Sequence, residues 1–285
     1  MSLAAESDFL LGMAEASRQR DAESRARLSD AQLSSQLTCL DTPLPLLLEH
    51  GGFDVIAEIK KRSPAEGKLD DGLVSPQQQA GVYIEGGAAA LSVLTEPSRF
   101  DGSLEDLQAV VAMAGATPVM RKDFLVSSYQ IREGRLAGAS GVLLIAAMLE
   151  AGQLEAMLEA AFELDMFVLV EAFDMADLDS CLPVLESMGP ALDGNRCRYM
   201  LGVNCRNLRT LQVEFDHFTR MAEALPAAVP CVAESGLTDV AQAQQLAKLG
   251  YRLALVGTAL MRSDNAAVVV GDIRRFGATG AAACS

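Results

Sequence analysis

The sequence contains no tryptophan, and aromatic residues of all kinds make up 5% of its 285 positions. A platform of aromatic side chains for stacking nucleic-acid bases is therefore not expected. The formal net charge of -15 also opposes nonspecific binding to nucleic acid or to an anionic membrane. A small anionic substrate would have to be held by local cations, because the overall charge of the protein repels it.

Histidine and cysteine occur in few informative patterns. His50 and His217 are the only histidines, which excludes a histidine-rich metal site and gives little basis for a catalytic histidine. A metal site built from carboxylates alone stays open at this point. The six cysteines form no C-x-x-C pair and no regular framework, which is typical of unpaired thiols in a reducing compartment.

Long apolar stretches are missing as well. No run approaches the roughly 20 residues of a membrane-spanning helix, and no signal peptide precedes the body of the chain. We therefore expect a cytoplasmic protein with neither a membrane nor a nucleic-acid partner. The sequence gives no indication of protein partners.

One segment predicts a buried strand that ends in charged residues. The apolar run 55–57 leads directly into Glu58, Ile59 and Lys60. Side chains alternate along a strand, so Glu58 and Lys60 would share one face at its end. An isolated pair of this kind is usually a structural ion pair. Similar signals recur along this chain, which favours a functional interpretation.

Apolar runs and helical patterns alternate through most of the chain, which predicts a parallel sheet covered by helices. The expected strands are 55–59, 89–94, 118–120, 141–145, 167–170, 200–203, 231–233 and 253–256. The expected helices are 76–84, 104–113, 129–137, 154–164, 176–185, 218–225, 240–249 and 266–273. Eight strand–helix units favour an α/β fold that closes into a (β/α)8 TIM barrel over an open sheet.

The barrel is expected to occupy residues 51–276 as one catalytic domain. Residues 1–50 form an N-terminal helical extension, which is either a solvated, frayed helix or a lid packed on the barrel. The final residues 277–285 are mostly small, and we expect a disordered tail there.

Polar residues cluster where the expected strands end. In this barrel type the loops after the strands build the active site, so inward ionisable groups there suggest acid–base chemistry. The strand ends carry Glu58 and Lys60, Lys122, Glu171, Asn204 with Arg206, and Glu234. Ser235-Gly236 and Gly257-Thr258 follow the seventh and eighth strands, where many such enzymes bind phosphate.

These segments together resemble the indole-3-glycerol phosphate synthase family from about residue 55 to about residue 264. Single pieces are common in barrel enzymes, but their order and number make the combined match specific. The matching segments are IAEIKKRSP (56–64), AAALSVLT (88–95), FDGSL (100–104), PVMRKDF (118–124), YQI (129–131), LVE (169–171), GVNCRNL (202–208), ESG (234–236), LVG (255–257) and LMR (260–262).

The resemblance implies a carboxy-lyase of tryptophan biosynthesis that needs no metal and no organic cofactor. Its phosphorylated substrate is 1-(2-carboxyphenylamino)-1-deoxyribulose 5-phosphate. Lys122 would protonate the carbonyl oxygen during ring closure. Lys60 and Glu58 would act as an acid–base pair, and Glu171 would assist dehydration. For Glu234, a structural role and a catalytic role both stay open.

The same resemblance assigns the binding residues. The groups expected to hold the ring carboxylate are Ser63, Asn204 and Arg206, because a guanidinium fork suits a carboxylate. The groups expected to hold the phosphate are Ser235, Gly236, Gly257 and Thr258. Phe100 and Phe124 would pack on the aromatic ring, although a plain core role is the alternative.

Several positions depart from the family pattern, namely Cys205, Thr258 and the pair Ser98-Arg99 before Phe100. The start of the chain also matches the family's N-terminal helix poorly. The segment 181–198 is longer than the family's usual connection between the fifth helix and the sixth strand. It should lie toward the N-terminal face of the barrel and affect stability or assembly more than chemistry. A related phosphate-binding barrel with another substrate therefore stays open, as does a binding or regulatory barrel without catalysis. The second is disfavoured, because a plain binder gains nothing from unpaired buried charge.

Overall fold

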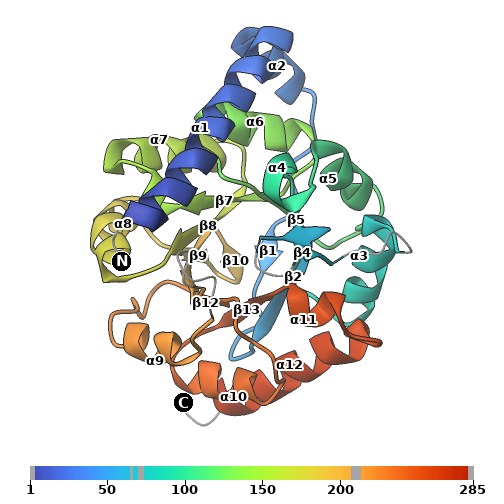
Figure 1. Ribbon diagram of the computed structural model, residues 1–285, viewed down its shortest axis with the longest axis vertical. Coiled ribbons are helices and arrows are strands. Elements are labelled where there is room, and N and C mark those ends of the chain that lie inside the picture. The colour runs from blue at the N-terminus through green and yellow to red at the C-terminus, as the bar shows by residue number, and fades with distance from the viewer. Residues whose placement is uncertain (1–3, 65–66, 70–73, 207–212, 282–285) are drawn as a thin grey trace.

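Eight parallel strands close into a barrel within the residues that the computed structural model describes, namely 4–64, 67–69, 74–206 and 213–281. Each strand pairs with the next along the chain, and β13 pairs with β2 to close the ring (Figure 1). The expected (β/α)8 barrel is therefore confirmed. The barrel strands are β2 (Asp54–Ile59), β5 (Ala90–Leu94), β6 (Val119–Lys122), β7 (Gly141–Ile145), β8 (Phe167–Ala172), β11 (Tyr199–Asn204), β12 (Cys231–Glu234) and β13 (Leu253–Val256).

Helices follow each barrel strand and surround the sheet (Figure 1). They are α3 (Pro76–Glu85), α4 (Pro97–Phe100), α5 (Leu104–Val111), α6 (Ser128–Leu136), η1 (Ala146–Met148), α7 (Ala151–Phe162), α8 (Met175–Ser187), α9 (Asp216–Ala222), α10 (Gln242–Lys248), α11 (Thr258–Met261) and α12 (Ala266–Ala281). Side-chain caps define several of their starts. The hydroxyl of Ser127, for example, accepts from the backbone N–H of Gln130 at the start of α6. No helix of the described residues is both long and apolar enough to cross a membrane.

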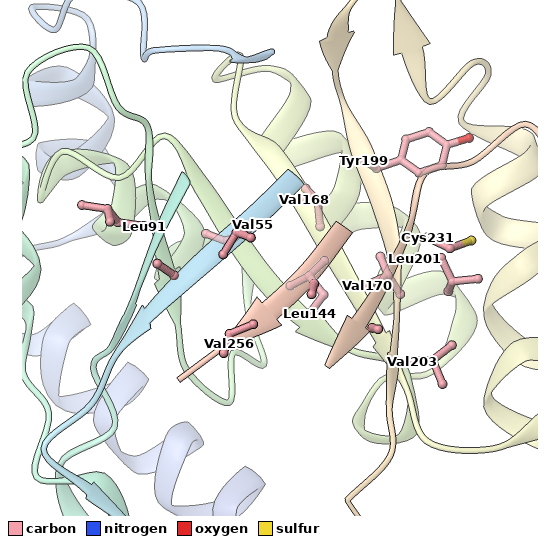
Figure 2. Packing of buried hydrophobic residues seen from close by; sticks show 14 of the residues in the cluster. Val55, Leu91, Leu144, Val168, Val170, Tyr199, Leu201, Val203, Cys231 and Val256 are labelled. Atoms are coloured by element: carbon pink, nitrogen blue, oxygen red, sulfur yellow. The ribbon is translucent and has the colours of Figure 1, made fainter. Parts of the chain in front are cut away.

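Alternation along the strands separates two apolar cores. Val55 and Ala57 on β2 face the helices, and Figure 2 shows such side chains around the barrel, including Leu91 and Val203. Ile56 faces inward and packs with residues of the other strands. Both faces are covered, which explains why the strands read as nearly continuous apolar runs.

A small antiparallel sheet fills the N-terminal end of the barrel. It consists of β1 (Leu46–Leu47), β10 (Arg196–Cys197) and β9 (Leu192–Asp193). The buried side chains of Leu46 and Cys197 pack in the inner core with Leu253, at the start of β13. The long segment 181–198 thus contributes to this end of the barrel, away from the strand ends that carry the polar residues.

The N-terminal extension packs on the barrel. It comprises α1 (Ala4–Arg27) and α2 (Asp30–Leu37), and α1 crosses beside α6 (Figure 1). Leu33 of α2 is fully buried, and the hydroxyl of Tyr129 on α6 donates to the carbonyl of Leu28 at 2.7 Å. Within the described residues the extension therefore packs against the barrel and is not a solvated, frayed helix; its role as a lid stays a prediction.

The C-terminal prediction was wrong for residues 277–281. Helix α12 continues to Ala281, and Gly277 and Gly280 are buried. A Cβ atom at Gly277 would lie 2.2 Å from Cγ of Phe53, so the absent side chain is what lets the helix approach the barrel. Small residues here permit close packing, which composition alone cannot distinguish from disorder. Residues 282–285, the rest of the expected tail, lie outside the described residues.

We predict that Gly277→Ala lowers the free energy of unfolding by about 1–3 kcal/mol, because the added methyl group overpacks against the rigid ring of Phe53. Urea unfolding followed by circular dichroism measures this change. Gly152→Ala is the control, since a Cβ atom there meets nothing within 4 Å. It should be neutral or stabilise α7 by about 0.5–1 kcal/mol. Equal stability of the two variants would contradict the packing of α12 described above.

Candidate active site

Strand alternation gathers ionisable side chains inside the C-terminal end of the barrel. Glu58 lies two residues after the inward Ile56, and Lys122 two residues after the inward Met120. The register pairs Asn204 with Glu234, so these strand ends lie side by side. Buried polar groups thus replace apolar ones in the last layer of the barrel.

Two lysines and three carboxylates meet in this layer. The Nζ atom of Lys122 lies 3.1 Å from an oxygen of Glu58, 3.1 Å from one of Glu234 and 3.9 Å from one of Glu171. The Nζ atom of Lys60 lies 2.7 Å from the other oxygen of Glu58. Glu58 therefore bridges the two ammonium groups. The structure brings together the four residues expected to be catalytic, and it adds Glu234.

The charges shift each other's protonation. Burial opposes ionisation of Glu58, but the positive charges of Lys122 and Lys60 outweigh it and lower the pKa of this carboxyl to about 2. Burial likewise opposes the charge on Lys122, yet the carboxylates around it raise the pKa of its ammonium group above the ordinary value. Both groups therefore stay charged at neutral pH.

Glu171 behaves in the opposite way. Its burial and the negative charge of Glu234 raise the pKa of its carboxyl well above the ordinary value, although Lys122 and a hydrogen bond with Asn204 act against this shift. A protonated Glu171 can donate a proton where the charged Glu58 cannot. Two nearby carboxylic groups in different environments are thus set for different roles.

Two glycines, Gly257 and Gly202, leave room for these carboxylates because they have no side chain. A Cβ atom at position 257 would lie 2.3 Å from Oε1 of Glu58, and one at position 202 would lie 2.0 Å from Oε1 of Glu234. Gly257 was expected to bind phosphate because a bare backbone approaches an anion closely. The structure adds a second reason for glycine there, namely the space that Glu58 occupies.

A cavity of about 430 Å³ opens above these groups. Every site residue expected from the sequence lines this cavity. Glu234 is not part of the lining, but its carboxylate pairs with Lys122, which is. The expected lining residues are Glu58, Lys60, Ser63, Phe100, Lys122, Phe124, Glu171, Asn204, Arg206, Ser235, Gly236, Gly257 and Thr258. The size of the cavity suits a small organic ligand.

One side of the cavity offers backbone and hydroxyl groups. Ser235 and Gly236, directly after β12, both have positive φ angles of 66° and 74°. A Cβ atom at Gly236 would lie 2.5 Å from Sγ of Cys205, so only glycine fits this turn without rearrangement. Across from it, the hydroxyl of Thr258 is buried and makes no hydrogen bond within the described residues. An anion there would satisfy it.

Another side of the cavity is aromatic. The ring centroids of Phe100 and Phe124 are 6.0 Å apart, and Phe9 of α1 meets Phe124 edge-on at the same distance. Phe9 was not expected from the sequence. The spacing of Phe9, Met13 and Ser17, four residues apart on one helical face, is the signal that could have indicated it.

The third side carries Asn204 and Arg206. The side-chain oxygen of Asn204 accepts from the backbone N–H of Arg206 at 3.0 Å, which fixes the turn after β11. Ser63 also lines the cavity and belongs to the antiparallel pair of β3 (Arg62–Ser63) and β4 (Gly67–Lys68), which follows β2. No group of three or more His, Cys, Asp or Glu side chains within the described residues is arranged to hold a metal ion.

Comparison with known sequences gives one family. The family model of indole-3-glycerol phosphate synthase matches residues 13–273. The indole-3-glycerol phosphate synthase of Mycolicibacterium gilvum (strain PYR-GCK) is 40% identical over 250 residues, which covers 87% of each chain. That of Salinibacter ruber (strain DSM 13855 / M31) is 39% identical over 230 residues, covering 81% of this chain and 80% of its own.

Solved structures with low sequence identity share the fold. A 3-hexulose-6-phosphate synthase from Salmonella typhimurium superposes with a TM-score of 0.59 at 14% identity, covering 80% of this chain and all 100% of its own. A thiamine phosphate pyrophosphorylase from Pyrococcus furiosus superposes with a TM-score of 0.54 at 15% identity, covering 79% and 95%. At this level of identity the likeness concerns the barrel alone.

The raised pKa of Glu171 leads to a prediction about stability. Between the ordinary pKa and the raised one, the folded protein binds a proton that the unfolded chain has released, so stability falls as pH rises through this window. Glu171→Gln removes that dependence and should raise the free energy of unfolding at pH 8 by on the order of 1 kcal/mol. Urea unfolding at pH 5 and pH 8 measures it.

The exposed Glu155 of α7 gives the matched control. Glu155→Gln should leave the pH dependence of unfolding unchanged. A Glu171→Gln variant that is less stable than the unmodified protein at pH 8 would show that the Glu171 carboxyl is charged in the folded state.

Proposed function

This chain belongs to the indole-3-glycerol phosphate synthase family, and from that premise we propose how its residues carry out the reaction. The enzyme is a carboxy-lyase of tryptophan biosynthesis. It converts 1-(2-carboxyphenylamino)-1-deoxyribulose 5-phosphate into indole-3-glycerol phosphate, carbon dioxide and water. The family decides against the other phosphate-binding barrels and the non-catalytic barrel considered from the sequence. The residue roles below are our proposal.

The observation that carries the proposal is the position of Lys122. Its ammonium group lies at the floor of the cavity, 3.1 Å from both Glu58 and Glu234, with a side-chain exposure of 14%. A charged donor fixed in a water-poor site stabilises negative charge that develops on a substrate oxygen. Ring closure creates such a charge, because the carbonyl oxygen becomes an alkoxide.

Three sides of the cavity match three parts of the substrate. Phe100 and Phe124 would pack on the aromatic ring. Arg206, with Asn204 and Ser63, would hold the ring carboxylate, because its planar guanidinium can donate two parallel hydrogen bonds. The phosphate would lie against the backbone and hydroxyl groups after the seventh and eighth barrel strands, namely those of Ser235, Gly236, Gly257 and Thr258.

Ring closure comes first. The ring carbon that bears the carboxylate attacks the ketone carbon, and the electron pair of the carbonyl bond moves to oxygen. Lys122 donates its proton to that oxygen, since an alkoxide is far more basic than a lysine amine. The carboxylate then leaves as carbon dioxide, and its bonding electrons restore the aromatic ring. Only a donor in place before the attack can stabilise the alkoxide as it forms.

Dehydration follows. The new hydroxyl group must leave as water, so it needs one proton, while the substrate loses another to form the indole double bond. Glu171 is suited to give the first proton, because burial and the charge of Glu234 raise the pKa of its carboxyl and favour the protonated form. Glu58 and Lys60, 2.7 Å apart, form the acid–base pair that would accept the second proton and return it to Lys122, whose Nζ atom lies 3.1 Å from Glu58. Glu171 regains its proton from solvent, because loss of carbon dioxide from the carboxylate consumes one proton overall. Glu234 keeps Lys122 in place and charged.

We infer no protein partner and no organic cofactor for this reaction, because protons alone are exchanged between the substrate and the side chains named. We also retain the expectation of a cytoplasmic enzyme, which is consistent with the unpaired thiols of Cys39, Cys181, Cys197, Cys205 and Cys231.

The direct test mixes the purified protein with the ribulose-phosphate substrate and follows indole fluorescence. The chain contains no tryptophan, so the product signal rises from a low protein background. We expect a continuous rise that depends on enzyme concentration. Folded protein that yields no indole product would contradict the proposed function.

Lys122→Met should lower kcat by about 10²–10⁴-fold, the range of contributions from a positioned acid, while inorganic phosphate still binds. Steady-state turnover and phosphate inhibition measure the two effects. The control is Lys248→Met, at an exposed position on α10, which should keep normal turnover. Unchanged kcat in Lys122→Met would remove this lysine from the mechanism.

Arg206→Ala should raise KM for the substrate by about 10-fold or more, since a charge-assisted hydrogen-bond pair is lost. The inhibition constant of inorganic phosphate should stay within about twofold, because the groups proposed to hold the phosphate are those of Ser235, Gly236, Gly257 and Thr258 and do not include Arg206. Competition assays with phosphate compare the two ligands. Equal losses of affinity for both would count against the carboxylate role of Arg206.

A further inference from the structure

One face of α1 points toward the barrel from Phe9 to Arg20. Phe9, Met13, Ser17 and Arg20 follow at intervals of four, four and three residues, which places them on one side of a helix. Met13 and Ser17 are buried, with exposures of 4% and 0%. The stripe begins with a ring in the substrate cavity and ends, about 16 Å along the helix axis, with a guanidinium group.

Arg20 contacts two buried carboxylates from different loops. Its guanidinium nitrogens lie 2.7 Å from an oxygen of Asp123 and 3.4 Å from an oxygen of Glu96. The carboxylates expose 1% and 0% of their side chains, whereas Arg20 exposes 23%. Buried carboxylates are costly without a partner. Arg20 compensates the charge of Asp123 together with the buried Arg121, whose guanidinium lies 3.3 Å from the other oxygen of Asp123, and it also pairs with Glu96.

Each of these carboxylates also fixes a phenylalanine of the cavity. Glu96 caps α4, where its oxygens accept from the backbone N–H groups of Ser98 and Arg99 at 2.9 and 2.6 Å, and Phe100 ends that helix. Asp123 accepts from the backbone N–H of Phe124 at 2.8 Å. Arg20 therefore joins the element that carries Phe9 to the two that carry Phe100 and Phe124.

Other contacts of α1 do not make this connection. The side chain of Gln130 donates to the hydroxyl of Ser17 at 2.9 Å, and Ser127 donates to Asp21 at 2.5 Å. Both tie α1 to the start of α6, beyond the β6 loop. The ion pair with Glu96 is the contact of Arg20 that reaches the α4 loop, which follows β5.

We propose that Arg20 is a positioning residue for the aromatic end of the cavity. By joining Asp123 to Glu96 it holds the rings of Phe9, Phe100 and Phe124 at the separation seen here. This inference rests on the proposed function in one respect, that the aromatic ring of the substrate lies among these three rings. The bidentate fork of arginine suits two carboxylates better than the single ammonium of lysine.

A single-tryptophan reporter tests the geometry without any substrate. Because the chain has no tryptophan, Phe9→Trp provides one emitting group at the aromatic end of the cavity. Adding Arg20→Met should shift its emission to longer wavelength and increase quenching by acrylamide about twofold or more. Arg18→Met on the same reporter is the matched control, since Arg18 pairs with Glu15 of its own helix and exposes 57% of its side chain.

Kinetics with Phe9 intact test the consequence for the reaction. Arg20→Met should raise KM about 10-fold with kcat within about twofold, and the inhibition constant of inorganic phosphate should not change. Arg20→Lys should recover part of the loss in KM, because one charge can reach one carboxylate. Arg18→Met should match the unmodified enzyme.

The outcomes separate the two proposals. If Arg20→Met leaves both the tryptophan emission and KM unchanged, the positioning role is wrong. A parallel loss of phosphate affinity, or a fall in kcat with unchanged KM, would also overturn it, because either points to a general disturbance of the site. Circular dichroism and the Arg20→Lys variant show whether the fold is intact. If instead the unmodified protein makes no indole product, the proposed function fails, while the emission result still decides the geometry.

Discussion

Lys122 holds a positive charge inside the barrel, 3.1 Å from each of two carboxylates, and the other groups of the site are arranged around that charge. Removing water strengthens each of these interactions and makes each unpaired member costly. The cluster is therefore held together by mutual dependence: Lys122 and Lys60 lower the pKa of the Glu58 carboxyl, whereas burial and the nearby Glu234 raise the pKa of the Glu171 carboxyl. A site of this kind offers both a strong cation and a neutral acid without any metal ligand.

The barrel supplies the geometry of that cluster through strand alternation. Side chains alternate with a period of two, so Glu58 points inward like Ile56, two residues before it. The parallel register sets Asn204 beside Glu234. The fold and the residues of the cavity floor could thus be predicted from the sequence, because both depend on local periodicity and on the rule that such barrels work at their strand ends. All eight strands were expected within a few residues of their observed bounds.

What escaped prediction depends on contacts between distant segments. Glu234 could be catalytic or structural from the sequence, and its contact with Lys122 joins positions 112 residues apart. Phe9 belongs to a helix whose apolar stripe is thin, and its place over the cavity follows from how α1 docks on α6. The composition of residues 277–281 suggested disorder, but small side chains are also what close helix packing requires, and the contacts with Phe53 and with Gln244 show that packing applies here. In each case the sequence did not reveal which distant residue makes the contact.

The small sheet of β1, β10 and β9 has a consequence for how substrate enters the cavity and products leave it. Leu46 and Cys197 fill the N-terminal end of the barrel, so in the described structure the cavity communicates with solvent on the opposite end, next to α1. Carbon dioxide, water and the bulky indole product must then depart along the route by which the substrate arrived. The two small molecules form before or with the final ring system, and they must pass it on the way out. An enzyme whose entrance, as far as the described residues show it, serves both directions is in this way exposed to obstruction by its own product.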